Sequence, residues 1–274
     1  LGPDGGGRPW PELAVLGDPV AHSLSPRLHA AALAKRGIDA RYEAIRVRRD
    51  QLDAALAAAL EGGVRGLNLT VPLKERGLAA AARATDECRR IGATNTLVAR
   101  AGAWMAHNTD ARGLAMALER ELGAGLPAQV RRCMILGSGG SARAALVALE
   151  GLGAGVVTVA ARDVRHADWA RRLGAVVEPL SSADPGAASL VVNCTPVGLD
   201  PDEPPPVEVD RLAPGAYVLD LTYADRPSRL LRGMTGRGQD GRAMLVAQAA
   251  LAFSAWYGAL PPVAEMAAAI GLDW

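Results

Sequence analysis

The stretch that decides the fold of the second half of the chain reads Val130-Arg131-Arg132-Cys133-Met134-Ile135-Leu136-Gly137-Ser138-Gly139-Gly140-Ser141-Ala142-Arg143. Residues 130–136 are predicted to form a strand, and an Ala/Leu-rich helix follows to Glu150. Between them lies a G-x-G-x-x-A pattern in the order strand, glycine turn and helix N-terminus, which is typical of dinucleotide sites. The glycines let the backbone approach a pyrophosphate, and the helix end offers free N–H groups. We therefore predict that residues 137–143 bind a dinucleotide.

In such folds, residues at the end of the next strand, here predicted at 156–160, contact the adenosine ribose of the dinucleotide. The chain continues as Ala161-Arg162-Asp163, about 20 residues beyond the glycine turn. An acid there favours the free 2′-hydroxyl of NAD, and an arginine favours the 2′-phosphate of NADP. Arg162, Arg165 and His166 favour NADP, whereas Asp163 favours NAD, and an ordinary solvated loop is the simpler alternative.

Two further strands are predicted in this half, at 190–194 and 217–221, and turns carrying Thr195 and Tyr223 follow them. The glycine turn in its strand–turn–helix context predicts a dinucleotide-binding domain in the second half. In the first half, strands at 12–16, 40–47 and 64–69 alternate with helices, which predicts a mainly parallel sheet with helices on both faces.

The last part of the chain is predicted to be helical. Residues 236–238 are expected to form a loop, and a long apolar helix, 244–257, follows Gly241 and carries Gln248. A final helix runs through Ile270. These helices resemble those of the first half, so we expect them to pack on the first domain.

The first half is organised around Gly66-Leu67-Asn68-Leu69-Thr70-Val71-Pro72-Leu73-Lys74. Residues 64–69 read as a buried strand, and Pro72 ends it because proline cannot donate to a sheet ladder. Asn68, Thr70 and Lys74 then lie where an α/β sheet delivers its chain to a crevice. A lone lysine on a first helical turn is usually a solvated surface residue, so this stretch alone does not make Lys74 catalytic.

Helix capping explains some candidate polar residues without any function. Ser25 before Pro26 is predicted to cap a helix, and Asp110 is well placed to cap the helix at 111–122. Ser23 is explained less well by capping. Two short strands at 97–100 and 104–106 are predicted to pair as a hairpin.

Composition excludes several classes of partner. A net charge of +1 favours neither a nucleic acid nor a membrane surface, and no apolar run is long enough to span a membrane. The three cysteines are scattered without disulfide or zinc spacing, which suits a reducing cytoplasm. The four histidines also lack metal-ligand spacing, so no metal is expected. Residues 1–9 are Gly/Pro-rich and are predicted to be a disordered leader.

Taken together, these segments resemble the shikimate dehydrogenase family of the aromatic biosynthesis pathway over about 14–258. The stretches that carry the resemblance are residues 17–26, 66–74, 92–97, 108–113, 137–143, 193–196, 220–223 and 241–248. The family has an N-terminal α/β substrate domain and a Rossmann domain that binds NADP. It reduces 3-dehydroshikimate reversibly to shikimate.

The resemblance implies roles for individual residues. Lys74 and Asp110 would form the catalytic pair. The substrate carboxylate would be held by Ser23, Ser25 and Tyr223, and the ring hydroxyls by Thr70, Asn95 and Gln248. The cofactor would contact Gly137, Ser138, Gly139, Gly140, Ser141, Ala142, Arg143, Arg162, Asp163, Thr195, Gly241 and Met244.

The chemistry fits these residue types independently. Hydride delivered to a ketone leaves an alkoxide, and a lysine ammonium can stabilise that charge and donate the proton. A neighbouring carboxylate keeps the lysine charged and oriented. Neutral serines suit a carboxylate where the shape of the ligand must be read, although an arginine would bind it more strongly.

The expected fold is α/β with two domains: an N-terminal α/β substrate domain with a mainly parallel sheet, and a Rossmann domain. The substrate domain is expected at 10–109, completed by helices at 245–274, and the NADP-binding domain at 110–244. The family's cofactor tip usually reads Asn-Arg-Thr, so Ala161 and Asp163 depart from it and leave NAD open. A quinate or quinate/shikimate dehydrogenase using NAD, a silent dinucleotide-binding sensor and a folate-type dehydrogenase are the alternatives. The chain is expected to act as a monomer or homodimer.

Overall fold

The structure is a computed structural model of the 274-residue chain, and it describes residues 9–274. The predicted leader therefore lies outside the described residues, apart from Pro9. The chain divides into two compact units. The first comprises the described residues up to Gly113 together with Leu245–Trp274, and the second is Leu114–Met244.

The first unit is built on a mixed six-stranded sheet in the order β2-β1-β3-β5-β6-β4. Its strands are β1 (Leu13–Gly17), β2 (Tyr42–Arg46), β3 (Gly66–Leu69), β4 (Arg83–Ala84), β5 (Thr96–Arg100) and β6 (Ala103–His107). Strand β1 pairs in parallel with β2 and β3, and β4 pairs in parallel with β6. Strand β5 runs antiparallel to both β3 and β6, which confirms the predicted hairpin.

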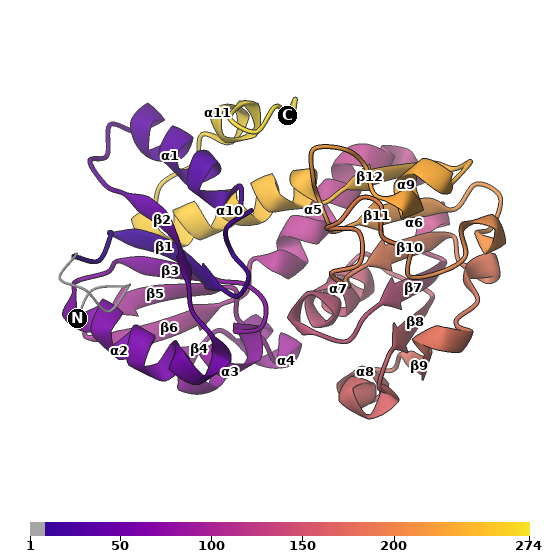
Figure 1. The fold of residues 1–274 in the computed structure, drawn as a ribbon, viewed down its shortest axis with the longest axis horizontal. Helices are drawn as coiled ribbons and strands as arrows, with labels where there is room; N and C mark the ends of the chain where they lie inside the picture. Colours follow the sequence, from indigo (N-terminus) through magenta and orange to yellow (C-terminus); the bar gives the residue numbers. More distant parts are fainter. Residues whose placement is uncertain (1–8) are drawn as a thin grey trace. The chain divides into compact units, whose positions relative to one another are not determined.

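Helices cover both faces of this sheet (Figure 1). One face packs against α1 (Ser25–Lys35), α10 (Arg242–Tyr257) and α11 (Val263–Ala268). The other packs against α2 (Leu52–Glu61), α3 (Lys74–Ala80) and α4 (Asp86–Ile91), and the single turn η1 (Arg49–Gln51) precedes α2. Strand β1 shows why two cores form: Leu13 and Val15 face one, and Ala14 and Leu16 face the other, because side chains alternate along a strand.

The second unit has a six-stranded parallel sheet in the order β12-β11-β10-β7-β8-β9. Its strands are β7 (Arg132–Leu136), β8 (Val156–Ala161), β9 (Val176–Pro179), β10 (Leu190–Asn193), β11 (Tyr217–Asp220) and β12 (Arg237–Asp240). The predicted loop at 236–238 is wrong, because Arg237 and Gly238 begin the edge strand β12. The α/β fold with a Rossmann-like second sheet is confirmed.

The helical segments of the second unit lie before and between these strands, and the first of them begins in the first unit. They are α5 (Asp110–Leu122), η2 (Gly123–Gly125), α6 (Leu126–Gln129), α7 (Gly140–Gly151), η3 (Val164–Ala167), α8 (Asp168–Arg172), η4 (Leu180–Ser182), η5 (Pro185–Ala187), η6 (Val209–Arg211) and α9 (Arg229–Gly233). The chain passes between the two units inside α5 and again inside α10. Each unit has polar residues at the edge of its own sheet.

Candidate active site

The candidate residues of the first unit gather at one edge of its sheet. Strands β1 and β3 are parallel, so the serine-containing loop after β1 and residues 70–74 after β3 leave by the same edge. Strand β5 is antiparallel to β3, so Asn95, which immediately precedes β5, lies at that edge too. Strand β6 reverses direction again and delivers Asp110 there. Four segments far apart in sequence thus converge.

Lys74 and Asp110 form an ion pair within this group. The Lys74 Nζ donates to Asp110 Oδ2 at 2.7 Å. The side chains are 11% and 6% exposed, so the pair is largely withdrawn from water. Lys74 is the first residue of α3, and Asp110 is the first residue of α5. The solvated-surface interpretation of Lys74 is therefore wrong.

Asn95 connects this pair to the rest of the site. Its Nδ2 lies 2.8 Å from Asp110 Oδ1, 2.8 Å from Thr109 Oγ1 and 3.2 Å from Gln248 Oε1. Its Oδ1 accepts from the Thr109 backbone N–H at 2.8 Å. Both oxygens of Asp110 are thus held, one by Lys74 and one by Asn95, which fixes the plane of the carboxylate.

Gln248 reaches this network from α10, 153 residues farther along the chain than Asn95. It can do so because Gly113 of α5 has no side chain. A Cβ at Gly113 would lie 2.9 Å from both the backbone N and the Cβ of Gln248. The two helices therefore cross in contact at this glycine, within the first unit.

Two predicted helix caps are wrong. Asn108, not Asp110, caps α5, because its Oδ1 accepts from the backbone N–H of Asp110 at 2.9 Å. Ser25 is the first residue of α1 rather than its N-cap, which is Leu24. Capping therefore explains neither Ser25 nor Asp110.

The serine pair and Thr70 lie in neighbouring loops of this edge. The Ser23 Oγ accepts from the Ser25 backbone N–H at 3.3 Å. The Asp18 N–H donates to the carbonyl of Val71, which joins the loop after β1 to the loop after β3. A Cβ at Gly17 would lie 2.3 Å from Thr70 Cγ2, so the two loops touch at this glycine.

A layer of polar residues lies beneath the site; Asn68 was predicted at this edge, but neither a role for it nor its partner Tyr42 was predicted. Asn68 is 5% exposed, and its Nδ2 donates to the Asn95 carbonyl and to Thr96 Oγ1. The Tyr42 hydroxyl donates to Asn68 Oδ1 at 2.7 Å. An asparagine inside an otherwise apolar strand was the signal that could have identified this layer, because a buried amide needs partners.

The second unit places the glycine turn as predicted, between β7 and α7. Gly137 has a φ of +108°, and a Cβ there would lie 3.3 Å from the backbone of Cys194. No side chain caps α7, whose N-cap residue is Gly139. Its first backbone N–H groups are therefore suited to a phosphate, as at other glycine-rich helix starts.

Of three more predicted cofactor residues in this unit, Thr195 follows β10, Gly241 follows β12, and Met244 lies in the first turn of α10. The Thr195 hydroxyl donates to Asn193 Oδ1 at 2.7 Å, which closes the turn after β10. The Gly241 N–H donates to the Thr222 carbonyl, and a Cβ at Gly241 would lie 2.4 Å from the Leu221 carbonyl oxygen. Met244 is buried, and Tyr223, the predicted carboxylate contact, is half-buried in the second unit.

At the ribose tip, Asp163 is held by Arg165. The hydrogen bonds from the Arg165 side chain, and then that from its backbone N–H, lower the pKa of Asp163 to about 2. Arg162 and His166 are exposed beside it. Ser141, Ala142 and Arg143 lie in the first turns of α7, where they were predicted.

Within residues 9–274, no His, Cys, Asp and Glu side chains gather in a group of three that could hold a metal ion. No helix among those residues is long and apolar enough to cross a membrane. Burial raises the pKa of the Cys88 thiol to about 11 and that of Cys133 to about 12, so both thiols stay protonated and unreactive near neutral pH.

Comparison with known proteins agrees with this arrangement. Residues 15–97 match the family described as the shikimate dehydrogenase substrate binding domain. The shikimate dehydrogenase (NADP(+)) of an Anaeromyxobacter species is 42% identical, with 93% of this chain and 94% of that protein covered.

Solved structures extend the comparison to the fold. The shikimate 5-dehydrogenase of Thermus thermophilus, in complex with NADP(H) and shikimate, has a TM-score of 0.83 and 38% identity, with 94% of this chain and 97% of that chain covered. The quinate dehydrogenase of Corynebacterium glutamicum, in complex with NAD, has a TM-score of 0.81 but 28% identity, with coverages of 94% and 97%. The chain belongs to the shikimate dehydrogenase family.

Proposed function

We propose that this protein is an NADP-dependent shikimate dehydrogenase that interconverts 3-dehydroshikimate and shikimate, with Lys74 and Asp110 as its catalytic pair. The observation that carries the proposal is the 2.7 Å ion pair between them, held in a buried polar network. Family membership supplies the reaction, and the geometry supports the choice of residues.

The amino-acid usage of the chain supports a special role for Lys74. Of the 30 lysines and arginines, only Lys35 and Lys74 are lysines. Lys35 is 57% exposed and pairs with Glu265 on the surface, whereas Lys74 is withdrawn from water beside Asp110. An arginine would serve a purely structural ion pair, but a guanidinium does not give up a proton at neutral pH. A lysine at this position therefore fits a group that must donate one.

The reaction follows from these roles. The glycine turn at Gly137 and Arg162 would hold NADPH, which would supply the hydride for the carbonyl carbon of 3-dehydroshikimate. Negative charge then develops on the carbonyl oxygen, and the Lys74 ammonium stabilises it and gives that oxygen a proton. Asp110, fixed by Asn95, orients the ammonium throughout. In the reverse direction Lys74 takes the proton back from the shikimate hydroxyl.

Substrate binding is assigned to the surrounding hydroxyl and amide groups. Ser23 and Ser25 would donate to the carboxylate, helped by Tyr223, and Thr70 and Gln248 would bind ring hydroxyls. Asn95 is assigned to the same set, although its amide already contacts Asp110 and Thr109. We therefore expect Asn95 to act mainly by holding Asp110 in place.

Cofactor binding is assigned to the second unit. The left-handed turn at Gly137 and the uncapped start of α7 suit a pyrophosphate. Arg162 would bind the 2′-phosphate, and Thr195, Gly241 and Met244 would border the rest of the cofactor. We also propose that the substrate domain, expected at 10–109 with 245–274, and the NADP domain, expected at 110–244, correspond to the two compact units, which places residues 110–113 with the first unit. We propose that the enzyme works in the cytoplasm as a monomer or homodimer.

The decisive experiment is a matrix of two substrates and two cofactors. The purified chain is given shikimate or quinate with NADP+ or NAD+, and kcat/KM is measured for all four pairs. The proposal predicts the highest value for shikimate with NADP+. Preferential oxidation of quinate with NAD+ would instead assign the chain to the quinate dehydrogenases, and no turnover with any pair would favour a binding-only protein.

A further inference from the structure

Asp163 is the residue of the cofactor tip that conflicts with NADP. A carboxylate at the end of the second strand of a dinucleotide fold usually accepts from the ribose hydroxyls of NAD, and its charge repels a 2′-phosphate. In the structure, Arg165 contacts this carboxylate.

The tip lies directly beside the glycine turn. The Gly137 N–H donates to the carbonyl of Ala160, near the end of β8, at 2.8 Å. Farther along, the Trp169 Nε1 donates to the Ser138 carbonyl at 3.2 Å. The Arg143 guanidinium lies 4.8 Å from the centre of the Trp169 ring. The segment between β8 and α8 is thus attached to the phosphate-binding turn at both of its ends.

Within this segment, one arginine occupies both carboxylate oxygens of Asp163. The Arg165 Nε and backbone N–H each lie 3.0 Å from Oδ1, and Nη2 lies 2.8 Å from Oδ2. The backbone bond makes Asp163 the N-cap of η3, so the turn itself brings Arg165 back over the carboxylate. His166 makes only a longer contact, with its Nδ1 4.0 Å from Oδ2.

We propose that the Asp163–Arg165 pair determines the cofactor preference of this enzyme. Arg165 is a specificity residue that acts through Asp163: it occupies the two oxygens that would otherwise accept from an NAD ribose, and it cancels the charge that would repel NADP. Arg162 then lies beside an ion pair that has no net charge, and not beside an unpaired carboxylate. This inference rests on the proposed use of NADP and explains how a chain with an acid at this position can use it.

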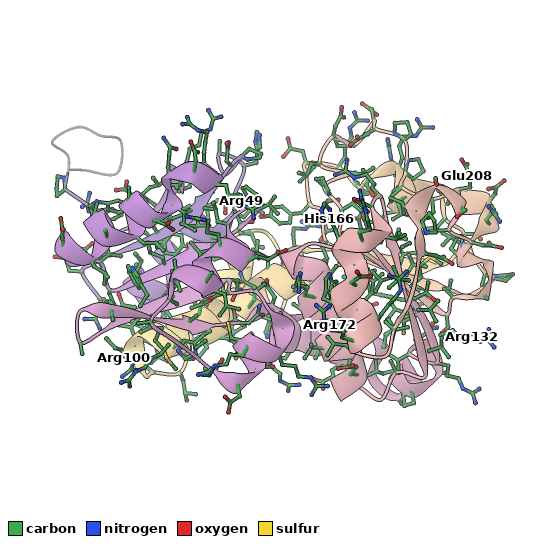
Figure 2. All side chains as sticks on the ribbon, turned by 90° about the horizontal axis from the view of Figure 1, so that it is seen from below. Arg49, Arg100, Arg132, His166, Arg172 and Glu208 are labelled. Carbon is green, nitrogen blue, oxygen red and sulfur yellow. The ribbon has the colours of Figure 1, made fainter. Side chains whose placement is uncertain are left out.

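A double-mutant cycle tests whether Arg165 acts through Asp163. Dissociation constants for NADP+ and NAD+ are measured by calorimetry, without substrate, for the wild-type chain, R165A, D163N and the double variant. Arg172→Ala is the control, an exposed arginine of the same unit. Figure 2 shows Arg172 apart from His166, the residue that follows Arg165. The ratio of the NAD+ constant to the NADP+ constant is the readout.

The wild type is expected to prefer NADP+. In R165A the ratio should fall about tenfold, because the released carboxylate accepts from the ribose of NAD and repels the 2′-phosphate. D163N should keep or increase the wild-type ratio. The double variant should match D163N within about twofold, the usual error of additivity, because no carboxylate remains to be occupied. R172A should leave the ratio unchanged.

Three results would overturn the inference: an unchanged ratio in R165A, an equal loss of NADP+ preference in the R165A and double variants, or a wild type that prefers NAD+. The second would mean that Arg165 binds the 2′-phosphate directly. These readouts need no turnover. A chain that follows the cycle but fails to oxidise shikimate would contradict the proposed reaction and leave this inference standing.

Discussion

Replacing Gly113 with alanine tests the helix crossing that places Gln248. The added Cβ would lie 2.9 Å from the backbone N and Cβ of Gln248. Restoring an ordinary contact requires the helices to separate by about 0.6 Å. The Gln248 Oε1, already 3.2 Å from Asn95 Nδ2, would then move beyond hydrogen-bonding distance. Overpacking of this kind costs about 1–3 kcal/mol of unfolding free energy.

The assay combines urea unfolding with steady-state kinetics. We expect G113A to lose that stability and to raise the KM for shikimate about fivefold, the effect of one lost hydrogen bond, with the KM for NADP+ unchanged. Gly151→Ala is the matched control, because this glycine is also helical and a Cβ there meets nothing within 4 Å. The free energy of unfolding of G151A should rise by about 0.5–1 kcal/mol. If G113A behaved like G151A, the close crossing would not exist.

Three further predictions concern other parts of the network. Burial lowers the pKa of His29 to about 3, so between pH ~6.5 and 3 the unfolded state binds a proton that the folded state does not, and stability should fall as the pH falls. Urea unfolding of H29F across that range should no longer show this contribution to the pH dependence of the unfolding free energy. The same measurement on H166N should still show it. Asn95→Ala should lower kcat by about 10–100-fold through misplacement of Asp110, with NADP+ binding unchanged by calorimetry. Trp169→Phe removes the bond to the Ser138 carbonyl and should weaken NADP+ binding about fivefold, with the KM for shikimate unchanged.

Prolines and glycines explain why most of the fold could be predicted from the sequence. Pro72 ends β3 before Lys74, and the glycine turn at 137–140 separates β7 from α7. Strand β12 was missed because Arg237–Asp240 is polar and lies at the sheet edge, where only one side of its backbone is paired. Propensity carries little information for such a strand.

Some contacts of the candidate site could be predicted from the sequence, and others depend on segments that are far apart in the chain. The pairing of Lys74 with Asp110 was inferred by resemblance, and the geometry shows the contact. The Asn95–Gln248 contact joins segments 153 residues apart, and no local pattern specifies it. The capping errors have a local cause: Asn108 and Asp110 are both good capping residues, and only the backbone path shows that Asn108 takes that role.

The most direct test of the central claim compares the two lysines of the chain. Lys74→Met and Lys35→Met are assayed for shikimate oxidation with NADP+, and NADP+ binding is measured by calorimetry. We predict that K74M loses about 10²–10⁴-fold in kcat, as expected for a general acid, and binds NADP+ normally. K35M should match the wild type, because Lys35 is an exposed surface residue. Near-wild-type turnover by K74M would contradict the assignment of Lys74 as the catalytic ammonium.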